Sequence, residues 1–165
     1  MAARNPLEYA IQLERDGQAF YTQAAAETRN PLGKKMFEGL AADERRHEEV
    51  LVGLANKANV ALSGGLPKER LVTLFGSLGP TLRAELDADA DDTRVIGKAL
   101  EMERASVELY RAQAQAVEAA KDRALYERLA QEESQHVDIL QSTLRYLNDT
   151  GHWFVWDEQG VLDGG

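Results

Sequence analysis

The chain has 165 residues and a mass of 18.3 kDa, the size of one ordinary domain that can bury a core without disulfides or a structural metal. Its formal net charge of −9 argues against nucleic acid or an anionic membrane surface as a partner, because either would need a basic footprint. The sequence has no cysteine, which excludes disulfides, zinc ribbons and four-cysteine iron centres within it. Any metal must therefore be held by oxygen or imidazole nitrogen.

The composition predicts an all-α protein. Ala, Leu, Glu and Arg are abundant, and these residues lose little side-chain freedom in a helix. The first residues lack the apolar stretch of a secretory signal, and no segment approaches about 18 uninterrupted apolar residues. We therefore expect residues 1–165 to form a single cytoplasmic domain without a membrane segment.

Two start signals place the first two helices. In Asn5-Pro6-Leu7-Glu8 the Asn can cap, the Pro suits the first helical position and the Glu completes a capping box, so a helix should begin here and run to about Thr28. Asn30-Pro31 repeats the signal, and apolar residues at helical spacing predict a second helix to near Leu62. The sequence 63–67, Ser-Gly-Gly-Leu-Pro, then stops it.

The region from Lys68 to Asp92 predicts a crossover connection. Gly76, Gly79 and Pro80 interrupt any long helix, so we expect one or two short helical turns here.

Two further helices complete the predicted bundle. Asp91 or Asp92 can cap a third helix that runs to about Ala119, and Lys121-Asp122 marks a tight joint before a fourth that ends near Asn148. Four long helices with one long connection between the second and the third predict the ferritin-like topology.

An aromatic tail, residues 149–165, follows the bundle of residues 5–148. It contains both tryptophans, Trp153 and Trp156, and we expect it to pack as a hydrophobic flap on the bundle or on a second subunit. His152 lies beside them and is interpreted as a packing or surface residue rather than a metal ligand.

The two halves of the chain repeat. Residues 10–55 match residues 99–144 at an offset of 89, polar positions included. In each half a Glu is followed by a Tyr seven residues later and by Glu-x-x-His 23 residues after the Tyr. The matched pairs are Glu14 with Glu103, Tyr21 with Tyr110, Glu44 with Glu133, and His47 with His136.

The spacing places these polar groups on the apolar faces of their helices, because residues three, four and seven apart share a face. Four ionised carboxylates in a dry core would cost many kcal/mol unless positive charge lies among them. Two divalent cations would supply it, and one Glu from each of two helices with Glu-x-x-His from the other two is the ligand pattern of ferritin-like dinuclear proteins. We predict a dinuclear metal site formed by Glu14, Glu44, His47, Glu103, Glu133 and His136.

Alternatives accompany this prediction. A duplicated bundle that has lost its metal would also keep the repeat, although unpaired buried carboxylates destabilise a core. Tyr21 and Tyr110 can be plain core residues or can hydrogen-bond a ligand carboxylate and take part in the chemistry. The neighbouring acids fall off the predicted ligand faces and are interpreted as solvated charges: Asp43, Glu48, Glu49, Glu101, Glu108 and Glu132.

Four segments resemble the rubrerythrin branch of the ferritin-like superfamily. Residues 13–21 and 41–47 are similar to its motifs on the first two helices, and residues 102–110 and 131–136 to those on the other two. The resemblance implies a non-haem di-iron centre that reacts with peroxide or oxygen. This sequence differs in having no rubredoxin module with four cysteines, and in having Ser106 where many members have an extra Glu.

Three functions are compatible with these observations. The first is an oxidoreductase that reduces hydrogen peroxide or oxygen with electrons from an external donor. The second is a ferroxidase that oxidises ferrous ion, and the third is an interaction module in which the metal is structural. We expect iron, with manganese or zinc as alternatives, in a homo-oligomer that is at least a dimer. In the first hypothesis Glu44 and Glu133 bridge the metals, Glu14 and Glu103 are terminal ligands, and His47 and His136 bind one metal each.

Overall fold

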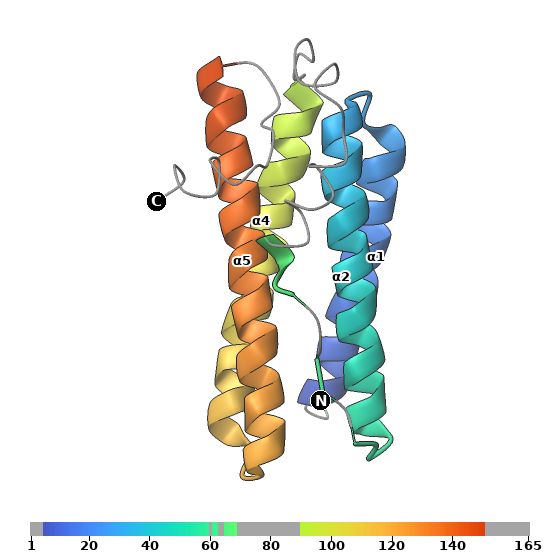
Figure 1. Cartoon of the computed structure of the whole chain (residues 1–165), viewed down its shortest axis with the longest axis vertical. Coiled ribbons are helices and arrows are strands. Elements are labelled where there is room, and N and C mark those ends of the chain that lie inside the picture. The colour runs from blue at the N-terminus through green and yellow to red at the C-terminus, as the bar shows by residue number, and fades with distance from the viewer. Residues whose placement is uncertain (1–4, 60, 63–64, 69–89, 151–165) are drawn as a thin grey trace.

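The computed structural model describes residues 5–59, 61–62, 65–68 and 90–150. This part of the chain forms an all-α, ferritin-like four-helix bundle (Figure 1). None of its helices is long and apolar enough to cross a membrane. The four long helices are α1 (Pro6–Glu27), α2 (Pro31–Ala55), α4 (Ala90–Ala116) and α5 (Ala120–Thr150).

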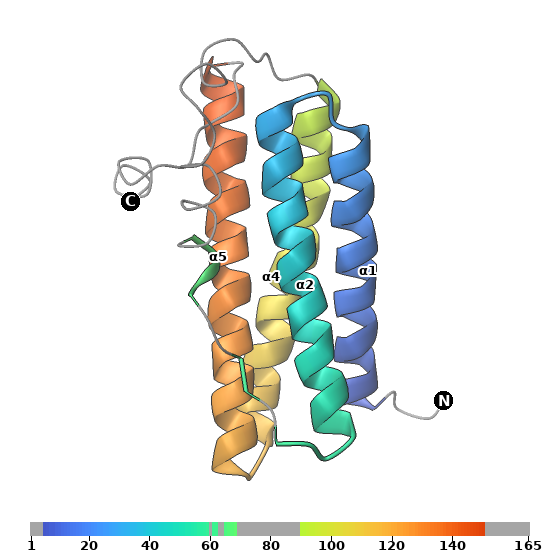
Figure 2. The ribbon, with the colours of Figure 1, turned by 45° about the vertical axis from the view of Figure 1, so that its right-hand side comes forward.

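The helix directions explain the long connection. α1 and α2 form one antiparallel pair and α4 and α5 form another, as the colour gradient in Figures 1 and 2 shows. α2 and α4 run in the same direction, so the chain has to return along the full length of the bundle between them. This is the crossover that the sequence predicted between its second and third helices.

The first two helices begin where their capping residues predict. The Asn5 side chain accepts a hydrogen bond from the amide of Leu7, and Pro6 occupies the first turn. The Asn30 side chain accepts from the amides of Leu32 and Gly33 at 2.9 and 3.3 Å. These bonds satisfy amides that have no partner inside a helix.

Two boundaries differ from the prediction. α2 ends at Ala55, well before Leu62, because Lys57 adopts a left-handed φ of 56° that a right-handed helix cannot contain. α4 already begins at Ala90, so Asp91 and Asp92 lie in its first turn rather than capping it. Their carboxylates still face the positive end of the helix dipole.

The core is divided into two apolar clusters along the bundle. One gathers around Tyr21, Phe37 and Leu140, and the other around Leu51, Tyr110 and Leu129. The predicted metal residues lie between the two clusters. On α1, Glu14 lies between Ala10 of one cluster and Tyr21 of the other, and on α2, Glu44 lies between Leu40 and Leu51.

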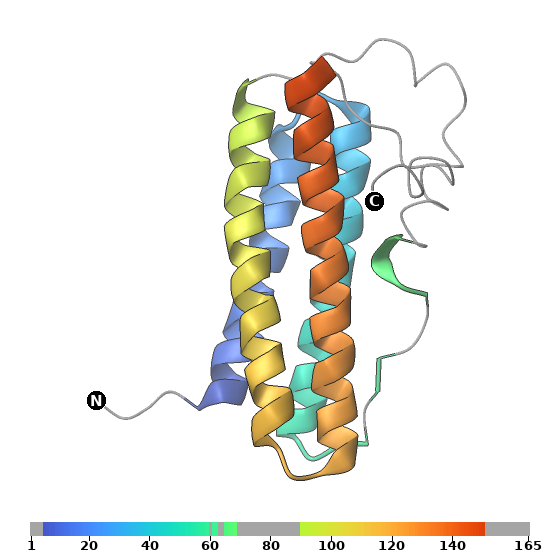
Figure 3. The same ribbon diagram turned by 90° about the vertical axis from the view of Figure 1, so that its left-hand side faces the viewer.

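Some predictions fall outside the described residues. They concern the helical turns expected within 69–89 and the tail with His152, Trp153 and Trp156. Of the connection, residues 65–68 are described and lie against α5 (Figure 3). There the amide of Lys68 donates to the Gln135 side chain at 3.2 Å, and its ammonium group contacts Asp138 at 3.1 Å.

Candidate metal centre

The six residues predicted as metal ligands come together in the interior of the bundle. None of them is more than 4% exposed. Their side-chain oxygen and nitrogen atoms form two groups of four, and within each group all atoms lie within 4.8 Å of one another. Both groups contain Glu44 and Glu133. The first group adds Glu14 and His47, and the second adds Glu103 and His136.

A glycine gives one shared carboxylate its space. A Cβ built on Gly17 of α1 would lie 3.0 Å from Oε2 of Glu44 and 3.4 Å from its Cδ. Few real Cβ contacts are this short, so a larger residue would push the carboxylate away. Gly17 therefore allows α1 to pass close to the centre, and Ser106 is its buried counterpart in the repeat.

Both imidazoles direct Nδ1 toward the carboxylates of the predicted ligands. Nδ1 of His47 lies 2.8 Å from Glu133 Oε1 and 3.4 Å from Glu14 Oε2. Nδ1 of His136 lies 3.0 Å from Glu133 Oε2 and 3.2 Å from Glu44 Oε1. The rings are stacked with centroids 5.7 Å apart. Nδ1 is thus the nitrogen available to a metal at the centre, which leaves Nε2 to bear a hydrogen.

Two carboxylates interpreted as solvated charges are in fact buried partners of these histidines. Glu132 is fully buried and Asp43 is 6% exposed. Glu132 Oε2 lies 3.0 Å from Nε2 of His47, and Asp43 Oδ2 lies 3.1 Å from Nε2 of His136. Each Nε2–H can donate to a carboxylate of the opposite helix, which fixes the ring with Nδ1 inward. The prediction that both acids face solvent was wrong.

The sequence contained a signal for this pair. Asp43 and Glu132 are also 89 positions apart, so the repeat preserves an acid directly before each Glu-x-x-His motif. The remaining acids of that set behave largely as expected. Glu49, Glu101 and Glu108 are exposed, while Glu48 is half-buried in an ion pair.

The two tyrosines hydrogen-bond across the bundle. The hydroxyl of Tyr21 on α1 donates to Oε1 of Glu103 on α4, and the hydroxyl of Tyr110 on α4 donates to Oε1 of Glu14 on α1. Both side chains are fully buried. Burial, followed by the nearby carboxylates, raises the pKa of each tyrosine well above its ordinary value. Both hydroxyls therefore hold their protons against Glu14 and Glu103.

The carboxylates divide into two electrostatic classes. Burial and then the charge of Glu133 raise the pKa of Glu44 well above its ordinary value. Burial also raises the pKa of Glu133 to about 7, against an opposing effect of His47. For Glu14 and Glu103 burial acts in the same sense, but the adjacent histidines prevail and lower the pKa. The two shared glutamates are thus the ones that resist ionisation without a cation.

The histidines favour positive charge at the same place. Burial alone would lower the pKa of His47 and His136, yet contact with carboxylates, first Glu133 and Glu103 respectively, raises both well above the ordinary value. Protons on the imidazoles offset part of the negative charge when no metal is bound. Metal ions would replace these protons.

Buried polar atoms without a hydrogen-bond partner suit the binding of a cation. Four buried side-chain atoms of the centre have no hydrogen-bond partner, although they approach one another: Oε2 of Glu14, Oε1 of Glu44, Nδ1 of His47 and Oε1 of Glu133. Buried polar groups normally have partners. Carboxylate oxygen and imidazole nitrogen are donors that suit iron, manganese and zinc. The residues therefore fit a pair of such ions.

Comparison with known proteins supports the same family. The family model described as Rubrerythrin matches residues 5–77, which span α1, α2 and the start of the connection. Comparisons with curated proteins and with solved structures found no match. The second half repeats the motifs of the first at the offset of 89 and folds against it as the other two helices of the bundle. The first half of the chain is therefore similar to the Rubrerythrin family, and the four helices form a ferritin-like bundle.

Proposed function

We propose that this protein is a non-haem di-iron oxidoreductase that reduces hydrogen peroxide or oxygen with electrons from an external donor. One observation carries the proposal: two overlapping groups of four ligands share Glu44 and Glu133. Carboxylates that belong to both groups would hold both ions, as in two-metal sites. Glu14 with His47 and Glu103 with His136 would then complete one ion each.

Burial of the centre favours a very small substrate. The six proposed ligands are at most 4% exposed, so a bulky organic substrate could reach them only after the helices separate. Peroxide and oxygen are small enough to enter with little rearrangement. Reduction of hydrogen peroxide to two waters takes up two electrons and two protons, and the external donor supplies the electrons.

Bound iron would supply two one-electron redox equivalents at the centre. The chain's own groups do the rest. Glu14 and Glu103 are kept ionised by the histidines, which suits terminal ligands, and the hydroxyls of Tyr110 and Tyr21 donate hydrogen bonds to them. The apolar clusters on both sides limit the access of water, which strengthens the electrostatic interactions inside.

The test begins with metal content. Protein purified with iron present should contain two ions per chain, and the ferrous protein should be oxidised rapidly by peroxide and turn over when a reductant is added. Oxidation of added ferrous ion in excess of the two bound ions, without reductant-dependent turnover, would instead identify a ferroxidase. A centre that holds two ions and reacts with neither peroxide nor oxygen would instead favour the interaction module, in which the metal is structural.

Ligand variants locate the ions. Glu103→Ala should reduce the metal content from two ions to one, because it removes a terminal ligand of one ion only. Glu101→Ala, an exposed residue of the same helix, is the matched control and should retain both. If Glu103→Ala retains two ions with unchanged affinity, the ligand assignment is wrong.

A further inference from the structure

Arginine occurs in only one of the two Glu-x-x-His motifs. Arg45 and Arg46 lie between Glu44 and His47, and their counterparts at the offset of 89 are Ser134 and Gln135. The acids before the motifs, Asp43 and Glu132, are both retained. The repeat thus keeps two acids that contact histidines but places arginine in one motif only, and of its two arginines Arg46 is the one that contacts a buried acid.

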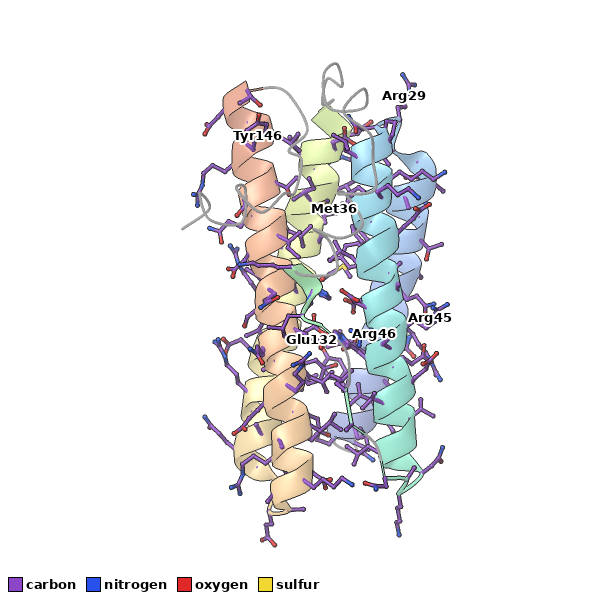
Figure 4. All side chains as sticks on the ribbon, viewed as in Figure 1. Arg29, Met36, Arg45, Arg46, Glu132 and Tyr146 are labelled. Carbon is purple, nitrogen blue, oxygen red and sulfur yellow. The ribbon has the colours of Figure 1, made fainter. Side chains whose placement is uncertain are left out.

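Arg46 reaches both of these acids. Its Nη2 donates to Oε2 of Glu132 on α5 at 2.8 Å and lies 3.5 Å from Oδ1 of Asp43 on its own helix. Figure 4 shows Arg46 beside Glu132 in the space between α2 and α5. The same Oε2 of Glu132 contacts His47, and the other oxygen of Asp43 contacts His136. A continuous series of contacts therefore joins the two histidines through one guanidinium group.

The charges explain why a cation is needed there. Two divalent ions would neutralise the four ligand carboxylates, but Asp43 and Glu132 add two buried negative charges beyond them. Arg46 meets this excess together with Arg128, whose Nε donates to Oε1 of Glu132 at 3.0 Å. With these interactions His47 and the two arginines lower the pKa of Glu132 against the effect of burial. Both arginine side chains are partly exposed at the surface, at 27% for Arg46 and 29% for Arg128.

The planar guanidinium group suits this task. It presents several N–H donors in fixed directions and keeps its charge at any physiological pH. It can thus hold two carboxylates in place at the same time, and each carboxylate in turn orients one imidazole. Partners that orient a metal-bound histidine typically change metal affinity about 10- to 100-fold when they are removed.

We propose that Arg46 is a positioning residue that fixes both histidines at once and thereby couples the two metal positions. The inference rests on the proposed dinuclear function, in which His47 and His136 each bind one ion. In this proposal the two metal positions are coupled through a side chain that lies between α2 and α5 and is not itself a ligand. Loss of this one side chain should weaken both positions together, whereas loss of a terminal ligand removes a single ion.

Zinc titration of the full-length, metal-free protein tests the proposal. In Arg46→Gln the affinity for both ions should fall about 10- to 100-fold, and Arg46→Lys should recover part of the loss because it restores the charge without the planar fork. Arg45→Gln is the matched control, since Arg45 is the adjacent residue and makes only an exposed contact with Glu49 at 4.0 Å among the interactions described. It should bind zinc as the wild type does.

A second measurement is independent of metal binding. In nuclear magnetic resonance spectra of the metal-free protein, the Nε2–H protons of both histidines should exchange slowly with water in the wild type and in Arg45→Gln. Both should exchange faster in Arg46→Gln, or in Arg46→Lys if the first variant does not fold. Unchanged exchange and unchanged zinc affinity in a folded Arg46 variant would overturn the inference. If the wild-type protein does not bind two ions, the proposed function is overturned instead. The exchange rates of the Nε2–H protons then still test whether Arg46 positions the histidines.

Discussion

The replacement Glu133→Gln should stabilise the metal-free protein while abolishing the proposed centre. The pKa of Glu133 is raised by burial from its ordinary 4.5 to about 7, so its ionised form is disfavoured in the fold. One unit of pKa corresponds to about 1.4 kcal/mol, which gives a cost on the order of 3 kcal/mol once the group is ionised above pH 7. Glutamine has the same shape as the protonated acid and avoids this cost.

Urea unfolding of the metal-free proteins at pH 5 and pH 8 measures the effect. At pH 5 the wild-type Glu133 is protonated and the two proteins should have similar stability. At pH 8 the variant should be more stable by up to about 3 kcal/mol, and excess zinc should reverse the order. Glu127→Gln, at an exposed position of the same helix, is the matched control and should unfold as the wild type does at both pH values. A Gln variant that is less stable than the wild type at pH 8 without metal would refute the reasoning.

Three further predictions concern the same centre. The pKa values of both shared glutamates and both histidines are raised, so the folded state binds more protons than the unfolded state. The metal-free protein should therefore lose stability as the pH rises from about 4.5 to above 7. Its zinc affinity should rise over the same range, because zinc replaces protons. Unfolding and zinc titrations at a series of pH values measure both trends. Gly17→Ala should weaken zinc binding by displacing Glu44, whereas Gly97→Ala, whose Cβ would meet no atom within 4 Å, should gain about 1 kcal/mol of stability at unchanged zinc affinity. Tyr21→Phe and Tyr110→Phe should each cost about 1–3 kcal/mol in unfolding experiments, since a buried carboxylate loses its donor.

Local signals were sufficient to predict the class of fold. The capping signals at Asn5 and Asn30 and the helical spacing of apolar residues predicted four long helices, and the one long connection predicted the ferritin-like topology. The end of α2 was predicted too late, because nothing in the apolar pattern between Ala55 and Leu62 reveals the left-handed conformation of Lys57. Backbone conformation at a helix end depends on local hydrogen bonds that composition does not specify.

The convergence of the six polar residues was predictable because it depends on repetition. Two identical spacings of Glu, Tyr and Glu-x-x-His are difficult to explain by chance, and helical periodicity then places them on inward faces. The contacts of Asp43 and Glu132 were missed for the opposite reason. Each acid lies beside the inward face of its own helix, and it is buried against a histidine of the facing helix and against Arg46. Such contacts depend on how two helices face each other, which no single-helix pattern contains.

The position of the centre between two apolar clusters reconciles its cost with a stable fold. Clustered carboxylates oppose folding when no metal is bound, whereas large side chains such as Phe37 and Leu140 on one side and Leu51 and Leu129 on the other are almost fully buried. Burial of one such side chain contributes about 1.5–3 kcal/mol, so a few of them offset the ionisation cost worked out for Glu133. The bundle can therefore fold first and bind metal afterwards, with ligands already placed by the helices.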